Sequence, residues 1–200
     1  ELRDEMVQEI TSLRIEHDID DDNVLNADET AVFIDSVSSK TIDVKGAPFV
    51  KIRSSGKDKD RITLMLAISL AGTVLKPFVV LKGVNWRRFR WAPSNDVLEH
   101  VVLASNKTAW MNHELCLQWI STSVLRHTKG KPAILIWDNF SAHIHQSVVD
   151  ELAKVNVYVV MTPKNCTSVA QPCDARVNAV IKAKLKVKWK THMYQAFMRV

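Results

Sequence analysis

The sequence feature that most constrains the fold is a short apolar run that stops at an aspartate. Residues 134–137 read Ile, Leu, Ile and Trp, and Asp138 follows directly. An apolar run without polar alternation predicts a strand, here over residues 133–137, that is buried on both faces and usually central in an α/β sheet. Ligands of such sheets bind beyond the carboxyl ends of the strands. Asp138 therefore stands where a site would lie, although an aspartate there also caps a following turn or helix.

The rest of the sheet is predicted from two more patterns. Residues 157–161 form a second all-apolar run, and between the two runs apolar residues recur at helical spacing, at Val148, Val149, Leu152 and Val155. A strand–helix–strand unit of this kind places its strands parallel, with a right-handed crossover. Upstream, residues 61–70 and 74–81 flank Ala71-Gly72-Thr73, whose glycine indicates an antiparallel hairpin.

The first strand is predicted over residues 24–35, with its core at Val32, Phe33 and Ile34. Side chains alternate across a strand, so Asp28 shares a face with Val32 while Glu29 points to the opposite face. The two acids cannot serve one site equally, and we take Asp28 as the candidate.

Helices are predicted near both ends of the chain and in its middle. Leu2, Met6, Ile10 and Leu13 fall at helical spacing, and Asn112 is a good cap for a helix that begins after it. In the last segment an apolar residue recurs every fourth position from Val177 to Met193, which favours a long helix. Asp174 would lie in its first turn, where the helix dipole stabilises a carboxylate without any further role.

The composition bounds the class of protein. A chain of 200 residues that is 46% hydrophobic suits one domain with a real core. No run approaches the roughly 18 apolar residues of a membrane span. Three cysteines without CxxC spacing indicate a reducing compartment and no disulfide framework.

Basic residues gather in clusters although the net charge is only +5. Arg87, Arg88 and Arg90 stand between Trp86 and Trp91. A second group lies in the predicted last helix at i, i+4 spacing, and it consists of Lys182, Lys186 and Lys190. Clustered cations beside aromatic rings predict nucleic-acid binding. The alternatives are a loop held by buried indoles and a solvated helix face.

The three aspartates could converge on one point and would then repel one another. Two divalent cations about 3.5–4 Å apart would relieve that repulsion and hold a phosphate between them. Hard oxygen ligands select Mg²⁺ or Mn²⁺. Two zinc sites are conceivable, one from His143 and His145 and one from Cys166, Cys173 and a histidine. Neither is favoured, because the sequence offers no second pair of ligands at metal spacing.

At these residues the sequence resembles the DDE transposase catalytic domain of the pogo branch of the mariner superfamily, whose domesticated relatives include centromere protein B and jerky-type proteins. The matching stretches lie in the family's order between about residues 24 and 189. They are Asn26-Ala27-Asp28-Glu29-Thr30, Arg61-Ile62-Thr63 with the glycine hairpin, Trp110-Met111, Asp138-Asn139 with His143, residues 163–168, and Gln171-Pro172-Cys173-Asp174.

The resemblance implies an RNase H-like α/β fold, with a mixed five-stranded sheet of three antiparallel and then parallel strands, flanked by helices. It implies metal-dependent DNA cleavage and strand transfer, with Asp28, Asp138 and Asp174 as catalytic, metal-binding residues. DNA would be the partner, a homodimer the candidate assembly and the nucleus the location. Two positions depart from the pattern, because Cys173 replaces an expected leucine and Arg176 an expected glycine.

The resemblance also divides the chain. Residues 1–22 would be a helix and linker that follow an upstream helix-turn-helix DNA-binding region, and residues 23–200 would be the catalytic domain. Two competing functions stay open: a domesticated, non-catalytic DNA-binding or chromatin protein, and a nuclease acting on RNA–DNA hybrids. Retention of all three aspartates favours the enzyme, since a fold kept only for binding need not retain them.

Overall fold

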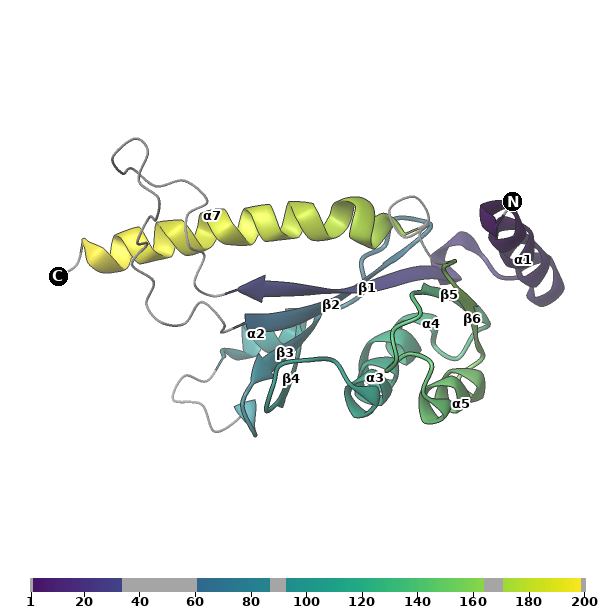
Figure 1. Cartoon of the computed structure of the whole chain (residues 1–200), viewed down its shortest axis with the longest axis horizontal. Coiled ribbons are helices and arrows are strands. Elements are labelled where there is room, and N and C mark those ends of the chain that lie inside the picture. Colours follow the sequence, from purple (N-terminus) through teal and green to yellow (C-terminus); the bar gives the residue numbers. More distant parts are fainter. Residues whose placement is uncertain (1, 34–60, 87–92, 164–170, 199–200) are drawn as a thin grey trace, which may run out of the picture.

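The computed structural model describes residues 2–33, 61–86, 93–163 and 171–198, and at its centre lies a six-stranded mixed sheet (Figure 1). The strands are β1 (Val24–Phe33), β2 (Arg61–Ser69), β3 (Phe78–Lys82), β4 (Val102–Asn106), β5 (Ala133–Trp137) and β6 (Val157–Met161). Their order is β4-β3-β2-β1-β5-β6. The pairs β1–β2 and β2–β3 are antiparallel, and the other three pairs are parallel.

The predicted α/β class and the three antiparallel strands are confirmed, but the predicted number of five strands is wrong. The sixth strand is β4, which pairs with β3 at one edge of the sheet. Its apolar residues give way to Ser105 and Asn106 after three positions. Because β4 pairs with one neighbour only and ends in polar residues, its apolar pattern is weaker than that of β5, which lies between two strands.

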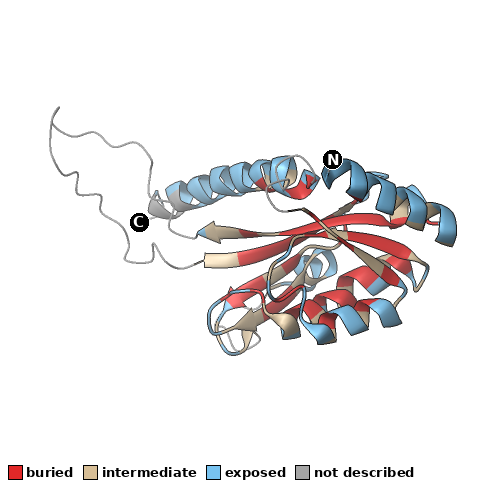
Figure 2. Ribbon diagram, turned by 45° about the vertical axis from the view of Figure 1, so that its right-hand side comes forward, coloured by how far each residue is buried: buried red, intermediate tan, exposed pale blue. Residues whose placement is uncertain are grey.

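Helices cover both faces of the sheet. They are α1 (Leu2–His17), α2 (Asn95–His100), α3 (His113–Trp119), α4 (Leu125–Thr128), α5 (Gln146–Lys154) and α7 (Asn178–Phe197). A short 3₁₀ helix, η1, spans Asp21–Asn23, and two π-helical turns span Ile120–Val124 (η3) and Cys173–Val177 (η4). The group α3, α4 and α5 lies on one face, and α1 and α7 lie on the other (Figures 1 and 2). No helix within these described ranges is long and apolar enough to cross a membrane.

The core is split by the sheet into two unequal clusters. The larger cluster packs β-strand residues such as Leu25 and Met65 against Trp119 of α3 and Leu152 of α5. The smaller one joins Met6 of α1 to Val24, Ile134 and Val160 on the other face. Figure 2 shows the buried strands between these two layers. The alternation along β1 sends successive side chains into different clusters.

The core of β1 lies earlier than the sequence pattern predicts. Val24, Leu25 and Ala27 are buried, whereas Val32 is half-buried and Phe33 is 52% exposed. Ile34 lies outside the described residues. The cause is strand pairing. β5 pairs with β1 only at residues 24–26, and beyond them β1 pairs with β2 alone.

Candidate active site

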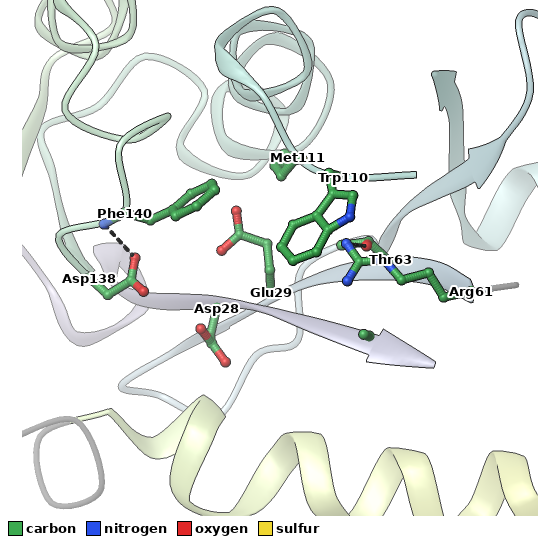
Figure 3. A pocket seen from close by; sticks show the side chains of 9 residues that line it. Asp28, Glu29, Arg61, Thr63, Trp110, Met111, Asp138 and Phe140 are labelled. Atoms are coloured by element: carbon green, nitrogen blue, oxygen red, sulfur yellow. Dashed lines mark hydrogen bonds between the residues drawn. The ribbon is translucent and has the colours of Figure 1, made fainter. Parts of the chain in front are cut away.

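A pocket of about 250 Å³ lies where β1, β2, the segment after β4 and the segment after β5 meet (Figure 3). Three carboxylates line it, those of Asp28, Glu29 and Asp138. Its other lining residues are Ala31, Arg61, Thr63, Trp110, Met111 and Phe140. The predicted meeting of Asp28 with Asp138 therefore has a structural basis, while Asp174 does not line this pocket.

Asp28 points from β1 toward the α7 side of the sheet (Figure 3). Its carboxylate accepts a hydrogen bond from the amide of Asn178, the first residue of α7. Burial raises the pKa of Asp28 to about 7, helped by the charges of Glu29, Asp174 and Asp138 and opposed by the Asn178 hydrogen bond. An acid this strongly perturbed inside a group of like charges is typical of a functional site.

Asp138 directly follows the last residue of β5. Its Oδ1 accepts a hydrogen bond from the backbone N–H of Phe140 at 3.3 Å and lies 2.7 Å from Nδ1 of His143. Burial would raise the pKa of Asp138, but the hydrogen bond and charge of His143 hold it below the usual value. One pocket thus contains one carboxyl group that binds a proton near pH 7 and one that stays charged.

His143 connects Asp138 to Glu29 through both nitrogens of its ring. Nε2 lies 2.7 Å from Oε1 of Glu29, and the side chain is fully buried. The ring also stacks on Trp137, with 3.6 Å between ring centroids. Burial lowers the pKa of His143, but the hydrogen bonds and charges of Asp138 and Glu29 outweigh it and raise the pKa to about 9. A protonated ring is a double donor, which suits two carboxylates.

Glu29 lines the pocket too, although the sequence analysis set it aside in favour of Asp28. The alternation along β1 is confirmed, since Asp28 bonds Asn178 on one side and Glu29 meets His143 on the other. Both side chains nevertheless line the same pocket. The spacing of Asp138, Asn139 and His143 was visible in the sequence, but nothing in it indicated that the partner of His143 would be Glu29.

Asp174 lies in η4, just before α7. The turn is tied to β1, because Cys173 donates from its backbone N–H to Oδ1 of Asn26 at 2.9 Å and from Sγ to the Asn26 carbonyl at 3.3 Å. Asp174 itself is exposed, and its charge contributes to the raised pKa of Asp28. π-helical turns occur frequently at functional sites. The unexpected Cys173 is buried and helps to anchor the turn rather than loosen it.

The donor set fits a hard divalent cation. Asp28, Asp138 and Asp174 offer carboxylate oxygens, and Oδ1 of Asn178 is buried with no hydrogen-bond partner among the described residues. Oxygen donors of this kind suit Mg²⁺ or Mn²⁺. Among the described residues, Glu29, Asp138 and His143 have ligand atoms within 4.8 Å of one another, whereas Asp28, Asp138 and Asp174 do not form such a group. Both nitrogens of His143 already face carboxylates, so this second group holds a proton more readily than a metal.

The zinc alternatives gain no support from the described residues. The side chain of His145 accepts a hydrogen bond from Ser147 N and so caps α5. Cys173 is committed to Asn26. Cys166 lies outside the described residues.

The predicted DNA-binding residues divide into two groups. Arg87, Arg88 and Arg90 lie outside the described residues. The lysine row, defined as Lys182, Lys186 and Lys190, is fully on α7 and exposed. It begins one helical turn beyond Asn178 and extends for about 12 Å at 1.5 Å per residue. The row therefore leads away from the acidic site on a helix that is anchored beside it.

The chain is similar in sequence to known proteins over most of its length. Residues 59–199 match the family model described as DDE superfamily endonuclease. The mouse protein "Pogo transposable element with KRAB domain" is 28% identical over 173 residues, covering 85% of this chain and 28% of the relative. The mouse Jerky protein is 30% identical over 176 residues, covering 82% of this chain and 29% of the relative. The chain thus spans under a third of the length of these curated relatives.

Solved structures share the fold at low sequence identity. The Mos1 transposase paired-end complex with left transposon end aligns with a TM-score of 0.56 at 16% identity, over 92% of this chain and 48% of that one. The Mos1 mariner paired end complex with Mn aligns with a TM-score of 0.56 at 16% identity, over 88% of this chain and 46% of that one. The fold is the RNase H-like fold of the Mos1 catalytic domain, and the chain belongs to the DDE superfamily endonuclease family.

Proposed function

We propose that this chain carries the catalytic site of a pogo-like DNA transposase, which cleaves DNA strands and joins them with the help of Mg²⁺ or Mn²⁺. The observation that carries the proposal is the meeting of Asp28 and Asp138 in one pocket, with the charge of Asp174 acting on Asp28. Structural neighbours of the chain are complexes with a transposon end and with Mn. DNA ends and a hard cation are therefore the ligands that this site would take.

Each aspartate would contribute from a different element. Asp138 is held at one oxygen by His143 and Phe140, which leaves its second oxygen for a cation. Asp28 would exchange its proton for the cation, since its pKa is raised to about 7 by burial and like charges. Asp174 would approach from η4. Two bound cations would supply the activation of water or a 3′-hydroxyl and the stabilisation of the leaving oxygen.

The binding-only alternative explains less of the structure. Packing Asp28 among like charges destabilises the folded chain, and a surface that only binds DNA gains nothing from it. A direct test is to incubate the protein with a labelled transposon-end duplex and Mg²⁺ or Mn²⁺. Metal-dependent strand breaks that disappear in Asp28→Asn support the enzyme. DNA binding without any cleavage in either metal supports the binding protein.

The cation should stabilise the fold through this site. At a hundredfold excess over the dissociation constant, Mg²⁺ or Mn²⁺ should add about 2.7 kcal/mol to the free energy of unfolding. Thermal unfolding with and without the metal measures the gain in the wild type, in Asp138→Ala and in the control Asp150→Ala. Asp150 is an exposed acid on α5, away from the site. An equal gain in all three proteins would contradict specific binding at Asp138.

The lysine row should hold the DNA backbone. Changing Lys182, Lys186 and Lys190 together to alanine should weaken binding to all DNA sequences alike and reduce the salt slope of binding by about 0.9 per lost phosphate contact. Affinity measured over a salt series gives the slope. A control variant changes Lys131 and Lys154, two exposed lysines that lie outside α7. A slope unchanged by the α7 variant would assign the row to solvation alone.

Three further parts of the function remain predictions. They are the division of the chain at residues 22 and 23, the homodimer, and the nuclear location. On the division of the chain, the structure shows that α1 is packed onto the sheet, because Met6 clusters with Val24, Ile134 and Val160.

A further inference from the structure

Asn26 is a buried polar residue at the point where β1 and β5 separate. It is 4% exposed, and its pairing with Ile136 is the last between the two strands. The side-chain amide continues that pairing, because its Nδ2 donates a 3.2 Å hydrogen bond to the Ile136 carbonyl. Asp28 lies two positions after Asn26, and Asp138 lies two positions after Ile136. The amide of Asn26 therefore joins the two strands just before the positions of both aspartates.

The same side chain also holds the turn that carries Asp174. Oδ1 of Asn26 accepts a 2.9 Å hydrogen bond from the backbone N–H of Cys173, at the start of η4. Beyond the other end of η4, the side chain of Asn178 donates to Asp28. Side chains two positions apart in a strand lie on the same face, so β1 binds both ends of the turn from one face. Asp174 lies between these two contacts.

The contacts of Asn26 oppose a repulsion that the site itself creates. The negative charges of Asp138 and Asp174 both act on Asp28. Like charges push their carriers apart, and η4 is the carrier that is not part of the sheet. A neutral amide that donates to one backbone segment and accepts from another holds such a turn in place without adding charge.

We propose that Asn26 is a positioning residue of the site, whose amide holds η4, and with it Asp174, next to the strands that carry Asp28 and Asp138. The inference rests on the proposed function, because it takes the three aspartates as the ligands of a cation. Groups that orient metal ligands without touching the metal typically change its affinity by about 10–100-fold. A purely structural role of Asn26 would lower the stability of the chain and leave that affinity unchanged.

Mn²⁺ affinity of the folded, full-length protein tests the role, with the free ion counted by electron paramagnetic resonance. Asn26→Leu keeps the size of the side chain and removes both hydrogen bonds of the amide, so it should weaken Mn²⁺ binding by about 10–100-fold. Asn26→Ala replaces it if the leucine variant does not fold. Ser123→Ala is the control and should keep the wild-type affinity. Ser123 is 3% exposed and donates to the Lys76 carbonyl at 3.3 Å, outside the pocket.

Amide hydrogen exchange, measured without added metal, reports the hold on η4 directly. Residues 173–175 should exchange about 10-fold faster in Asn26→Leu, as expected when a buried N–H loses its partner. Asn26→Asp should keep the slow exchange of the wild type, because its carboxylate still accepts a hydrogen bond from Cys173. This rescue separates the acceptor from the bulk of the side chain.

The two readouts distinguish this inference from the proposed function. Unchanged exchange at residues 173–175 in a folded Asn26→Leu protein would overturn the positioning role, and so would faster exchange with unchanged Mn²⁺ affinity. A wild type that binds no Mn²⁺ would remove the proposed function instead. Exchange that depends on Asn26 would then still support its hold on η4, and exchange that does not depend on it would overturn both.

Discussion

Replacing Asp138 by asparagine is expected to lower the rate of DNA cleavage by about 10³-fold or more. Asparagine keeps the size of the side chain and can still accept the hydrogen bond from Phe140, but it removes the negative charge that would hold a cation. A loss of about 4 kcal/mol of transition-state stabilisation corresponds to that factor, and a metal at a phosphoryl centre contributes several kcal/mol. Single-turnover cleavage of a transposon-end duplex measures the rate.

The same loss is expected for Asp28→Asn and Asp174→Asn, since the three charges act on one centre. Asp150→Asn provides the matched control, because Asp150 is an exposed acid on α5 that bonds Gln146. DNA affinity measured without metal should be unchanged or slightly higher in the three variants, since removing a negative charge reduces repulsion of phosphate. Full cleavage activity in Asp174→Asn would remove Asp174 from the proposed triad and leave Glu29 as the third acid of the pocket.

The strand that ends directly before Asp138 and its neighbour β6 could be predicted from the sequence, because both consist of apolar and aromatic residues. β5 lies inside the sheet between β1 and β6, and β6 pairs with it in parallel, and every residue from 133 to 137 and from 157 to 161 is apolar or aromatic. The ends of these two strands agree with the predicted ends. The hairpin was predictable for a different reason, because its turn needs Gly72 at φ of 91°.

The missed features depend on contacts between distant segments. Glu29 and His143 are 114 positions apart, and no local pattern relates them. The two hydrogen bonds of the Asn26 amide likewise join segments that are 110 and 147 positions apart. Alternation along β1 separated Asp28 from Glu29 without choosing between them, and the end of an apolar strand indicated Asp138. Neither pattern could show that a buried histidine would join Asp138 to an unassigned glutamate.

His143→Ala is expected to destabilise the chain by about 3 kcal/mol near pH 7. The change removes a buried cation between two carboxylates, and breaking such a group by deleting one partner typically costs about 3–5 kcal/mol. We take the low end because the Asp138 side chain is 38% exposed and is partly screened by solvent. Urea unfolding measures the difference. His100→Ala is the control, since His100 is an exposed histidine at the end of α2 and should change stability by less than about 0.5 kcal/mol.

The pH dependence separates charge from packing in this variant. The pKa of His143 is raised in the folded state to about 9 from 6.5, so the stability contributed by its charge is fully present below pH 6.5 and is lost as the pH rises through about 9. The gap between wild type and His143→Ala should therefore be largest at pH 6 and narrow by pH 10. What remains at pH 10 is the stacking of the neutral ring on Trp137. A gap of equal size at both pH values would mean that His143 supports the pocket by packing alone, and Asp138 would then owe its lowered pKa to the Phe140 hydrogen bond rather than to an imidazolium.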